Sequence, residues 1–292
     1  MNSNIDLHLH TTCSDGADDP LELVAKLSKL GVNLLSITDH DSVKAYSKLK
    51  SHTKYHTKII RGVELTFVHD NYIRHMLAYN FSLPKMENEL NKLYTSSNLI
   101  KHEEGMLKDL FKRCNETGLK IDKHIKIETG NRGEAFNKAY DSLVSFPENL
   151  KLCPSLCSHT KFFWHECMNK NSKFSIDGSI GIPGLIEVLS LIKRCHGLAV
   201  LAHPFQYPIK NNAYEINMNI IKLAINLGLD GIEAYHSSAT KNQSDELCSI
   251  ANKNNLFVTG GSDYHGNKKI SDTKIKKHDV EKFLNIVDVF EI

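Results

Sequence analysis

Ionisable side chains recur in this sequence where short apolar strands are predicted to end. Alternating Ile5, Leu7 and Leu9 predict a strand over 4–9, with His8 and His10 at its end. Further strands are predicted over 33–38, 59–64, 72–79, 198–202, 231–235, 256–259 and 285–291. The ionisable residues within or just after these strands are Asp39, His40, Asp41, Glu64, His75, His203, His236, Asp263 and His265. A buried, unpaired charge costs several kcal/mol, so groups placed in this way need partners or metal ions.

Helices are predicted between most of these strands. Asp19, Pro20 and Glu22 form a helix start, and an apolar face follows as far as Leu30. Other helices are predicted over 42–49, 182–195, 215–227 and 239–253. Repeated βα units predict a parallel sheet, and six to eight of them favour a closed or distorted barrel over an open sheet.

The pattern changes between the fourth and fifth strands. Helical periodicity dominates 84–179, with helices predicted over 131–144 and 160–168. We therefore predict that residues 1–83 and 180–292 form the α/β barrel. Residues 84–179 are predicted to form an inserted, mostly helical subdomain that covers the site.

Composition narrows the class of protein. The 36 basic and 34 acidic residues leave a net charge of +2, which argues against a nucleic-acid binder that relies on bulk charge. The seven cysteines form no CxxC pair, so reduced thiols are expected. No apolar run approaches the roughly 20 residues of a membrane span, and the first ten residues lack the features of a secretory signal. We expect a cytoplasmic protein without membrane association.

The spacing of the histidines predicts a metal centre. Alternate residues of a strand point to the same side, so His8 and His10 can reach one ion, and Asp263 and His265 repeat this spacing. Imidazole and carboxylate together suit zinc, manganese or iron. A single pair of this kind is as easily explained by hydrogen-bonded core histidines, but several strand ends together favour a metal site. The histidines interpreted as solvated or structural are His52, His56, His69, His102, His124, His159, His165, His196 and His278.

Seven segments of the chain resemble the motifs of the PHP (polymerase and histidinol phosphatase) family, in order and spacing. They are DLHLHTTCSDG, SITDHDS, GVELT, RHMLAY, LAHP, GIEAYH and GGSDYHG, and they extend from Asp6 to Gly266. The resemblance implies a distorted (β/α)7 barrel with a helical insertion. It also implies up to three divalent ions, of manganese, zinc or iron, at the carboxyl ends of the strands.

The resemblance further implies three sets of metal ligands. They are His8, His10, Glu64 and Asp263; Glu64, His75 and His203; and Asp15, His40 and His265. Every one of these positions carries a residue of the expected type. The resemblance therefore implies a catalytic member of the family with two to three bound ions.

Length and the insertion between His75 and His203 resemble the nucleoside 3′,5′-bisphosphate phosphatases, which also shorten RNA fragments from the 5′ end. Those relatives carry a Gly-Arg-Pro-His block in the insertion, for which this chain has residues 131–134, Asn-Arg-Gly-Glu. The resemblance implies hydrolysis of a phosphomonoester by a metal-bound hydroxide. The expected substrate is the 3′-phosphate of a nucleoside 3′,5′-bisphosphate or the 5′ end of a short oligoribonucleotide.

Other polar residues are expected to assist. Arg132 and Arg74 are candidates for binding phosphate, because guanidinium pairs bidentately with it. Asp39 is expected to orient a ligand imidazole. His236 or Asp41 is expected to act as an acid or to contact the substrate, and the sequence does not choose between them.

Alternative functions remain at this point. One is a phosphatase for another small ester, of the histidinol-phosphate type, and another is a metal-dependent amidohydrolase. A proofreading nuclease for long DNA would need a more basic surface, and a non-catalytic scaffold would be expected to lack a ligand. We expect a small phosphorylated partner, a nucleotide or short oligonucleotide, and no long nucleic acid. The sequence leaves the oligomeric state open.

Overall fold

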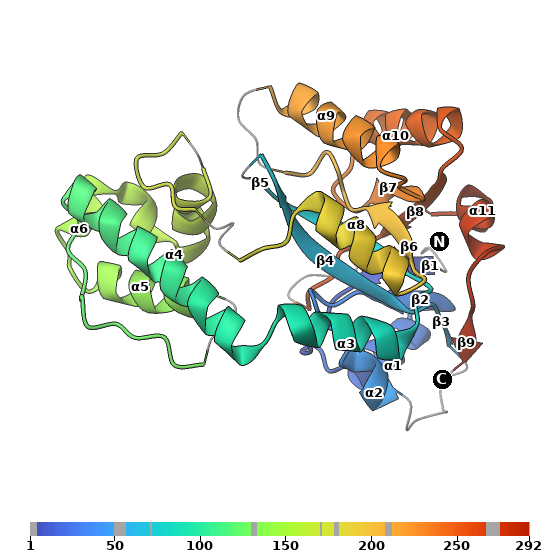
Figure 1. The fold of residues 1–292 in the computed structure, drawn as a ribbon, viewed down its shortest axis with the longest axis horizontal. Coiled ribbons are helices and arrows are strands. Elements are labelled where there is room, and N and C mark those ends of the chain that lie inside the picture. Colours follow the sequence, from blue (N-terminus) through green and yellow to red (C-terminus); the bar gives the residue numbers. More distant parts are fainter. Residues whose placement is uncertain are drawn as a thin grey trace. The chain divides into compact units, whose positions relative to one another are not determined.

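The computed structural model describes residues 5–49, 57–70, 72–129, 133–169, 171–177, 181–207, 212–266 and 275–291 (Figure 1). The chain divides into two compact units. The sheet unit contains Met1–His69, Arg74–Leu90 and Pro183–Ile292, and the helical unit contains Asp70–Ile73 and Asn91–Ile182. The longer boundary falls inside α3 (Leu83–Leu93), after Leu90.

The sheet unit holds two sheets. The first has the order β1-β2-β3-β9, built from β1 (Ile5–Leu9), β2 (Leu34–Ile37), β3 (Lys58–Ile59) and β9 (Phe290–Glu291). The second has the order β4-β5-β6-β7-β8, built from β4 (Gly62–His69), β5 (Tyr72–Tyr79), β6 (Leu198–Leu201), β7 (Gly231–His236) and β8 (Phe257–Gly261). The strand predicted over 59–64 is thus wrong, because the chain passes from β3 in one sheet to β4 in the other.

The expected parallel pairing is found for only some of the strands. β1–β2, β2–β3, β6–β7 and β7–β8 are parallel, but β3–β9 and β5–β6 are antiparallel. Tyr79 at the end of β5 pairs with Leu198 at the start of β6. The long connection between β5 and β6 therefore leaves and re-enters the sheet at the same end of the strands. It does not have to cross the face of the sheet.

Backbone hydrogen bonds join the two sheets near the ends of β1, β2 and β8 and within β4. The Glu64 amide in β4 donates to Thr38 O just beyond β2, at 3.1 Å. The Asp263 amide just beyond β8 donates to His8 O at 3.0 Å, and the His10 amide donates to Tyr264 O at 2.9 Å. The fold is therefore mixed α/β, with the ends of β1, β2 and β8 drawn together beside Glu64 of β4. A closed barrel stays a prediction.

Apolar helix faces cover the sheets. In α1 (Pro20–Lys29), Asp19 accepts from the Leu21 amide and Leu23, Val24 and Leu27 are buried, which confirms the predicted helix start. The other helical elements of this unit are α2 (Ala45–Leu49), α8 (Leu185–Arg194), α9 (Ala213–Asn226), α10 (Lys241–Lys253), η3 (Lys277–Val280) and α11 (Glu281–Leu284).

The helical unit has its own apolar core. Its elements are α4 (Ser96–Thr117), α5 (Glu134–Val144), α6 (Asn149–Leu152), η1 (Pro154–Cys157), α7 (His159–Lys161) and η2 (Phe162–Cys167). Leu107 and Leu110 from α4 pack with Phe136 from α5 and Phe162 from η2. The predominance of helix matches the sequence pattern, whereas the covering of the site by this unit stays a prediction.

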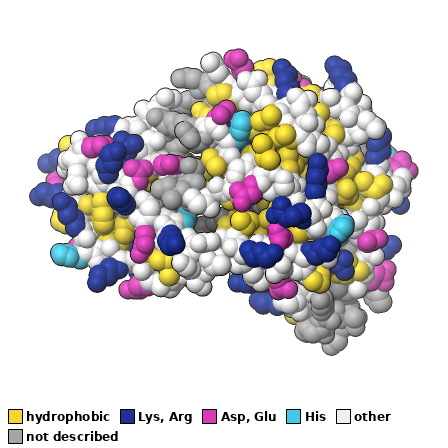
Figure 2. All heavy atoms as spheres, in the orientation of Figure 1, with side chains coloured by type: hydrophobic (Ala, Val, Ile, Leu, Met, Phe, Trp, Pro, Cys, Tyr) yellow, Lys and Arg dark blue, Asp and Glu magenta, His cyan; other side chains and the backbone are white. Residues whose placement is uncertain are grey.

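No described helix combines the length and apolar composition needed to cross a membrane. On the face drawn in Figure 2, Lys and Arg side chains are interspersed with Asp and Glu. This mixture accords with the nearly balanced charge of the whole chain.

A buried glutamate organises the helical unit. The Glu103 side chain of α4 is fully buried, and its Oε1 and Oε2 accept hydrogen bonds from the amides of Gly133 at 3.1 Å and Ala135 at 2.8 Å. Gly133 is the N-cap of α5 and supplies no side-chain cap of its own. Glu103 therefore satisfies amides at the start of a neighbouring helix, where negative charge is favourable.

We expect Glu103→Ala to lower the free energy of unfolding by about 2–3 kcal/mol, because one buried and one part-buried amide lose a charged acceptor. Glu103→Gln keeps one acceptor oxygen and should fall between this variant and the wild type. The exposed neighbour offers a matched control, Glu104→Ala, which should change stability by less than about 0.5 kcal/mol. Urea denaturation of the full chain, followed by circular dichroism, measures all three. Equal losses for the two alanine variants would contradict the capping role.

Candidate metal centre

Strand β1, which lies at the edge of the first sheet next to β8 of the second, carries His8 and is followed by His10. Both His8 and His10 are fully buried, and their ring centroids are 5.2 Å apart. β8 passes directly over His8, since a Cβ on Gly261 would lie 2.2 Å from the His8 Cβ. Only glycine allows this approach, so β8 can bring Asp263 and His265 to the histidines of β1.

Glu64 lies at the centre of the cluster and is 1% exposed. Its Oε2 is 3.2 Å from both His8 Nε2 and His10 Nε2, and 3.3 Å from His40 Nδ1. Its Oε1 faces a different pair, at 3.2 Å from His75 Nδ1 and 2.9 Å from His203 Nε2. The sequence pattern predicted Glu64 at the end of a strand, but the residue lies inside β4. Each carboxylate oxygen thus serves a separate set of imidazoles.

Two aspartates complete the cluster from loops. Asp263 Oδ1 lies 3.4 Å from His8 Nε2 and 3.2 Å from His10 Nε2. Asp15 lies 3.5 Å from His10 Nδ1 and 3.4 Å from His265 Nε2. Three groups have ligand atoms close enough to share an ion: His8, His10, Glu64 and Asp263; His10, Asp15, His40 and His265; and His40, Glu64 and His75.

These groups resemble the sets expected from the sequence, with one difference. The group around His75 contains His40, whereas the resemblance placed His203 there. His203 nevertheless contacts the same Glu64 oxygen as His75 does. The structure thus brings all the expected ligand residues together, and their assignment to particular ions stays a proposal.

Buried polar atoms in the cluster fit a cation. Among the described residues, several of its atoms are fully buried and make no hydrogen bond: His8 Nε2, His10 Nδ1 and Nε2, His40 Nδ1, His75 Nδ1 and Glu64 Oε2. Leaving such atoms unpaired is costly. A divalent ion would satisfy imidazole nitrogens and carboxylate oxygens at once, so the residues present fit the metal that the family resemblance implies.

The pKa shifts of one imidazole and two carboxylates suit metal ligands. Burial lowers the pKa of His40 to about 3, so its ring is neutral at pH 7 and has a lone pair to offer. Burial alone would raise the pKa of Glu64, but attraction to the surrounding imidazoles, that of His8 foremost, holds it well below its usual range. Asp263 is likewise ionised, because nearby imidazoles lower its pKa despite burial.

The residues expected to assist lie in different settings. Asp39 accepts from the Thr11 amide and hydroxyl, both at 2.7 Å, and from the Ser14 hydroxyl at 2.8 Å. It therefore holds the loop that carries Asp15, and in its described hydrogen bonds it meets no imidazole. Asp41 accepts from the amide and hydroxyl of Thr66, at 2.9 and 2.7 Å.

His236 adjoins the cluster, with Nε2 at 3.4 Å from Asp263 Oδ2 and Nδ1 at 2.8 Å from Ser238 Oγ. Arg74 is 2% exposed, donates to Asn217 Oδ1 at 2.9 Å, and lies over the Tyr207 ring. Its expected contact with phosphate stays a prediction. Arg132 lies outside the described residues.

Sequence reasoning missed Glu233. This residue of β7 is fully buried, with Oε1 2.9 Å from His8 Nδ1. A glutamate between Ile232 and Ala234, in the middle of an apolar strand, was the available signal. The sequence pattern instead indicated His236, at the end of the same strand, as a site residue.

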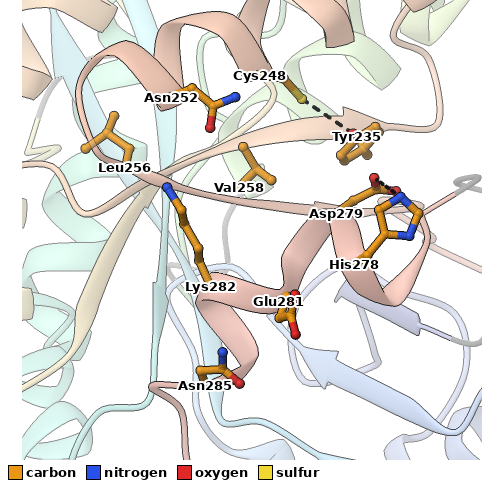
Figure 3. A pocket seen from close by; sticks show the side chains of 10 residues that line it. All are labelled: Tyr235, Cys248, Asn252, Leu256, Val258, His278, Asp279, Glu281, Lys282 and Asn285. Atoms are coloured by element: carbon orange, nitrogen blue, oxygen red, sulfur yellow. Dashed lines mark hydrogen bonds and ion pairs between the residues drawn. The ribbon is translucent and has the colours of Figure 1, made fainter.

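A separate cavity of about 420 Å³ lies elsewhere in the sheet unit (Figure 3). Its lining includes Tyr235 and Cys248, which face each other at 3.5 Å, and Asp279 with its neighbour His278. None of the expected metal ligands lines it. The expected metal ligands therefore lie in the histidine and carboxylate cluster, outside this cavity.

Residues 6–144 match the family model of the PHP domain. The chain is 25% identical to phosphoribosyl 1,2-cyclic phosphate 1,2-diphosphodiesterase of Eggerthella lenta, over 89% of this chain and 94% of the relative. It is 26% identical to 5′-3′ exoribonuclease of Haemophilus influenzae, over 91% of each. It is 23% identical to 3′,5′-nucleoside bisphosphate phosphatase of Chromobacterium violaceum, over 90% and 87% respectively.

A solved structure has a similar fold. It is titled as an amidohydrolase from Chromobacterium violaceum with bound sulfate and no metal, and it matches with a TM-score of 0.64 at 19% identity. The match covers 92% of this chain and 90% of the other. At this identity the likeness concerns the fold alone.

We expect manganese to stabilise the protein by about 2.7 kcal/mol per ion at a 100-fold excess over the dissociation constant, because only the folded chain assembles the cluster. Glu64→Gln should lose most of this gain, since it weakens contacts to both sets of imidazoles. Glu22→Gln, at an exposed position of α1, should retain it. Thermal unfolding with manganese and with EDTA measures the effect. Identical melting of the wild type in both would contradict a metal centre here.

Proposed function

We propose that this chain hydrolyses the 3′-phosphate of a nucleoside 3′,5′-bisphosphate or the 5′ end of a short oligoribonucleotide. The chain carries a PHP domain and belongs to the PHP family, whose members are metal-dependent phosphoesterases. The observation that carries the proposal is Glu64, whose two oxygens face separate sets of histidines. This arrangement suits a carboxylate shared between ions that act on one phosphate. The names of two relatives support the choice of substrate.

The ligands would hold two to three ions of manganese, zinc or iron. Bound divalent ions supply a water of lowered pKa as the nucleophile and positive charge for the phosphate oxygens. Glu64, Asp15 and Asp263 would provide the anionic ligands, and the histidines would provide neutral ones. Asp39 keeps the Asp15 loop in place through Thr11 and Ser14.

A proton must reach the leaving alkoxide, and His236 is the better placed of the two expected donors. Its Nε2 lies beside Asp263 at the edge of the cluster. Both carboxylate oxygens of Asp41, in contrast, accept from Thr66. We therefore propose that His236 Nε2 gives a proton to the leaving group or contacts it.

Arg132 is proposed to bind the phosphate that is not cleaved. This assignment rests on the sequence, because guanidinium pairs with phosphate through two parallel hydrogen bonds. The balanced overall charge supports a small substrate, for which a few directed contacts suffice. A long nucleic acid would require a more extended basic surface.

We expect the manganese-loaded protein to hydrolyse a nucleoside 3′,5′-bisphosphate faster than a simple monophosphate. Arg132→Ala should raise KM for the bisphosphate and spare the monophosphate, with a roughly 10- to 150-fold loss in kcat/KM from one charge-assisted contact of about 1.5–3 kcal/mol. Arg113→Ala, in α4, is the matched control. The panel should include histidinol phosphate, a cyclic phosphodiester, a cyclic amide and oligonucleotides of increasing length. Preference for the amide or for long DNA would overturn the proposal.

Activity should rise with pH from about 6 toward 8 to 9, because the nucleophile must be deprotonated and the ligand imidazoles must be neutral. The pH profile of kcat/KM at saturating manganese tests this expectation. His236→Ala should lower kcat, because the leaving group loses its proposed proton donor, while the rise at lower pH stays in place. A sharp optimum near pH 5 would instead indicate a nucleophile of another kind.

A further inference from the structure

Glu233 is fully buried beside the cluster, and the proposed reaction assigns it no role. Both of its carboxylate oxygens are engaged. Oε1 lies 2.9 Å from the Nδ1 of His8, and Oε2 accepts a hydrogen bond from the backbone amide of His203 at 2.9 Å. One side chain of β7 thus contacts two of the expected metal ligands, which come from different sheets.

The contact with His8 determines which nitrogen carries the proton. A carboxylate can only accept, so Nδ1 of His8 must donate. In the neutral ring, the form that binds a metal ion, Nε2 then keeps its lone pair. That Nε2 faces the cluster, at 3.2 Å from Glu64 Oε2 and 3.4 Å from Asp263 Oδ1. It is also one of the buried atoms for which the described residues provide no hydrogen bond. Glu233 therefore turns the free lone pair of His8 toward the centre.

The contact with His203 fixes a backbone of unusual geometry. His203 has a φ of 25°, a region that residues with a side chain rarely adopt. It comes just after β6, where the regular ladder with β7 has ended at Leu201 and Ile232. The Glu233 carboxylate accepts the His203 amide in place of a backbone carbonyl. His203 Nε2 is thereby held 2.9 Å from Glu64 Oε1.

We propose that Glu233 is a positioning residue for the metal centre. It holds His8 in the tautomer whose Nε2 faces Glu64 Oε2, and it holds His203 with its Nε2 beside Glu64 Oε1. The inference rests on the proposed function only in that it assumes a metal centre. Groups that orient metal ligands in this way typically change metal affinity 10- to 100-fold when they are removed.

The test measures zinc affinity without any substrate. Zinc binding to the metal-free full chain is followed by competition with a chromophoric chelator, for wild type, Glu233→Gln and Glu233→Ala. Glutamine keeps the volume of glutamate but has one acceptor oxygen for two donors. We expect roughly 10- to 100-fold weaker zinc binding for Glu233→Gln, and a larger loss for Glu233→Ala. Glu187→Gln, at an exposed position of α8, should bind as the wild type does.

Two further measurements separate positioning from simple stability. Circular dichroism identifies which variants are folded, and Glu233→Gln alone decides the test if Glu233→Ala is not. Nitrogen-15 spectra of the zinc-loaded wild type should show the His8 proton on Nδ1, with His8→Asn used to assign the signal. A folded Glu233→Gln that binds zinc with wild-type affinity, or a His8 proton on Nε2, would overturn the role of Glu233 alone. A wild type that binds no zinc would overturn the metal centre and, with it, the proposed function.

Discussion

The fold depends on burying one carboxylate among several imidazoles. Glu64 is almost inaccessible to solvent, and its histidine neighbours come from β1, β5 and the loops after β2 and β6. A charge in such a place is tolerated only when it is compensated on every side. Strands of both sheets must therefore bring residues to the same point. The backbone bonds between β1 and β8, and between β2 and β4, hold them there.

Much of this site could be predicted because its signals are local. Alternation along β1 predicts that His8 and His10 face one side, and both are buried in the cluster. The pairing of His40 with His75 could not be predicted, since it depends on distances between side chains from separate strands. Glu233 was missed for a related reason. Its role comes from contacts with residues far away in the sequence, at positions 8 and 203.

The strand directions show the same limit at the level of the fold. Patterns of apolar residues identify strands and helices well, as the start of α1 shows. These patterns do not indicate whether a strand that follows a long insertion pairs parallel or antiparallel with its neighbour. The antiparallel pairing of β5 with β6 is decided by the return of the chain to Tyr79, which no local pattern records.

The capping of α5 by Glu103 has a consequence for recognition. The positive end of a helix is an ordinary place for a protein to receive an anion, because its first amides are free. In α5 the amides of Gly133 and Ala135 already bind a carboxylate that belongs to the chain itself. An incoming phosphate would meet negative charge at this helix end instead of open donors. Selectivity for an anionic ligand in this part of the chain must accordingly come from cationic side chains, whose length and number can vary without disturbing the helix.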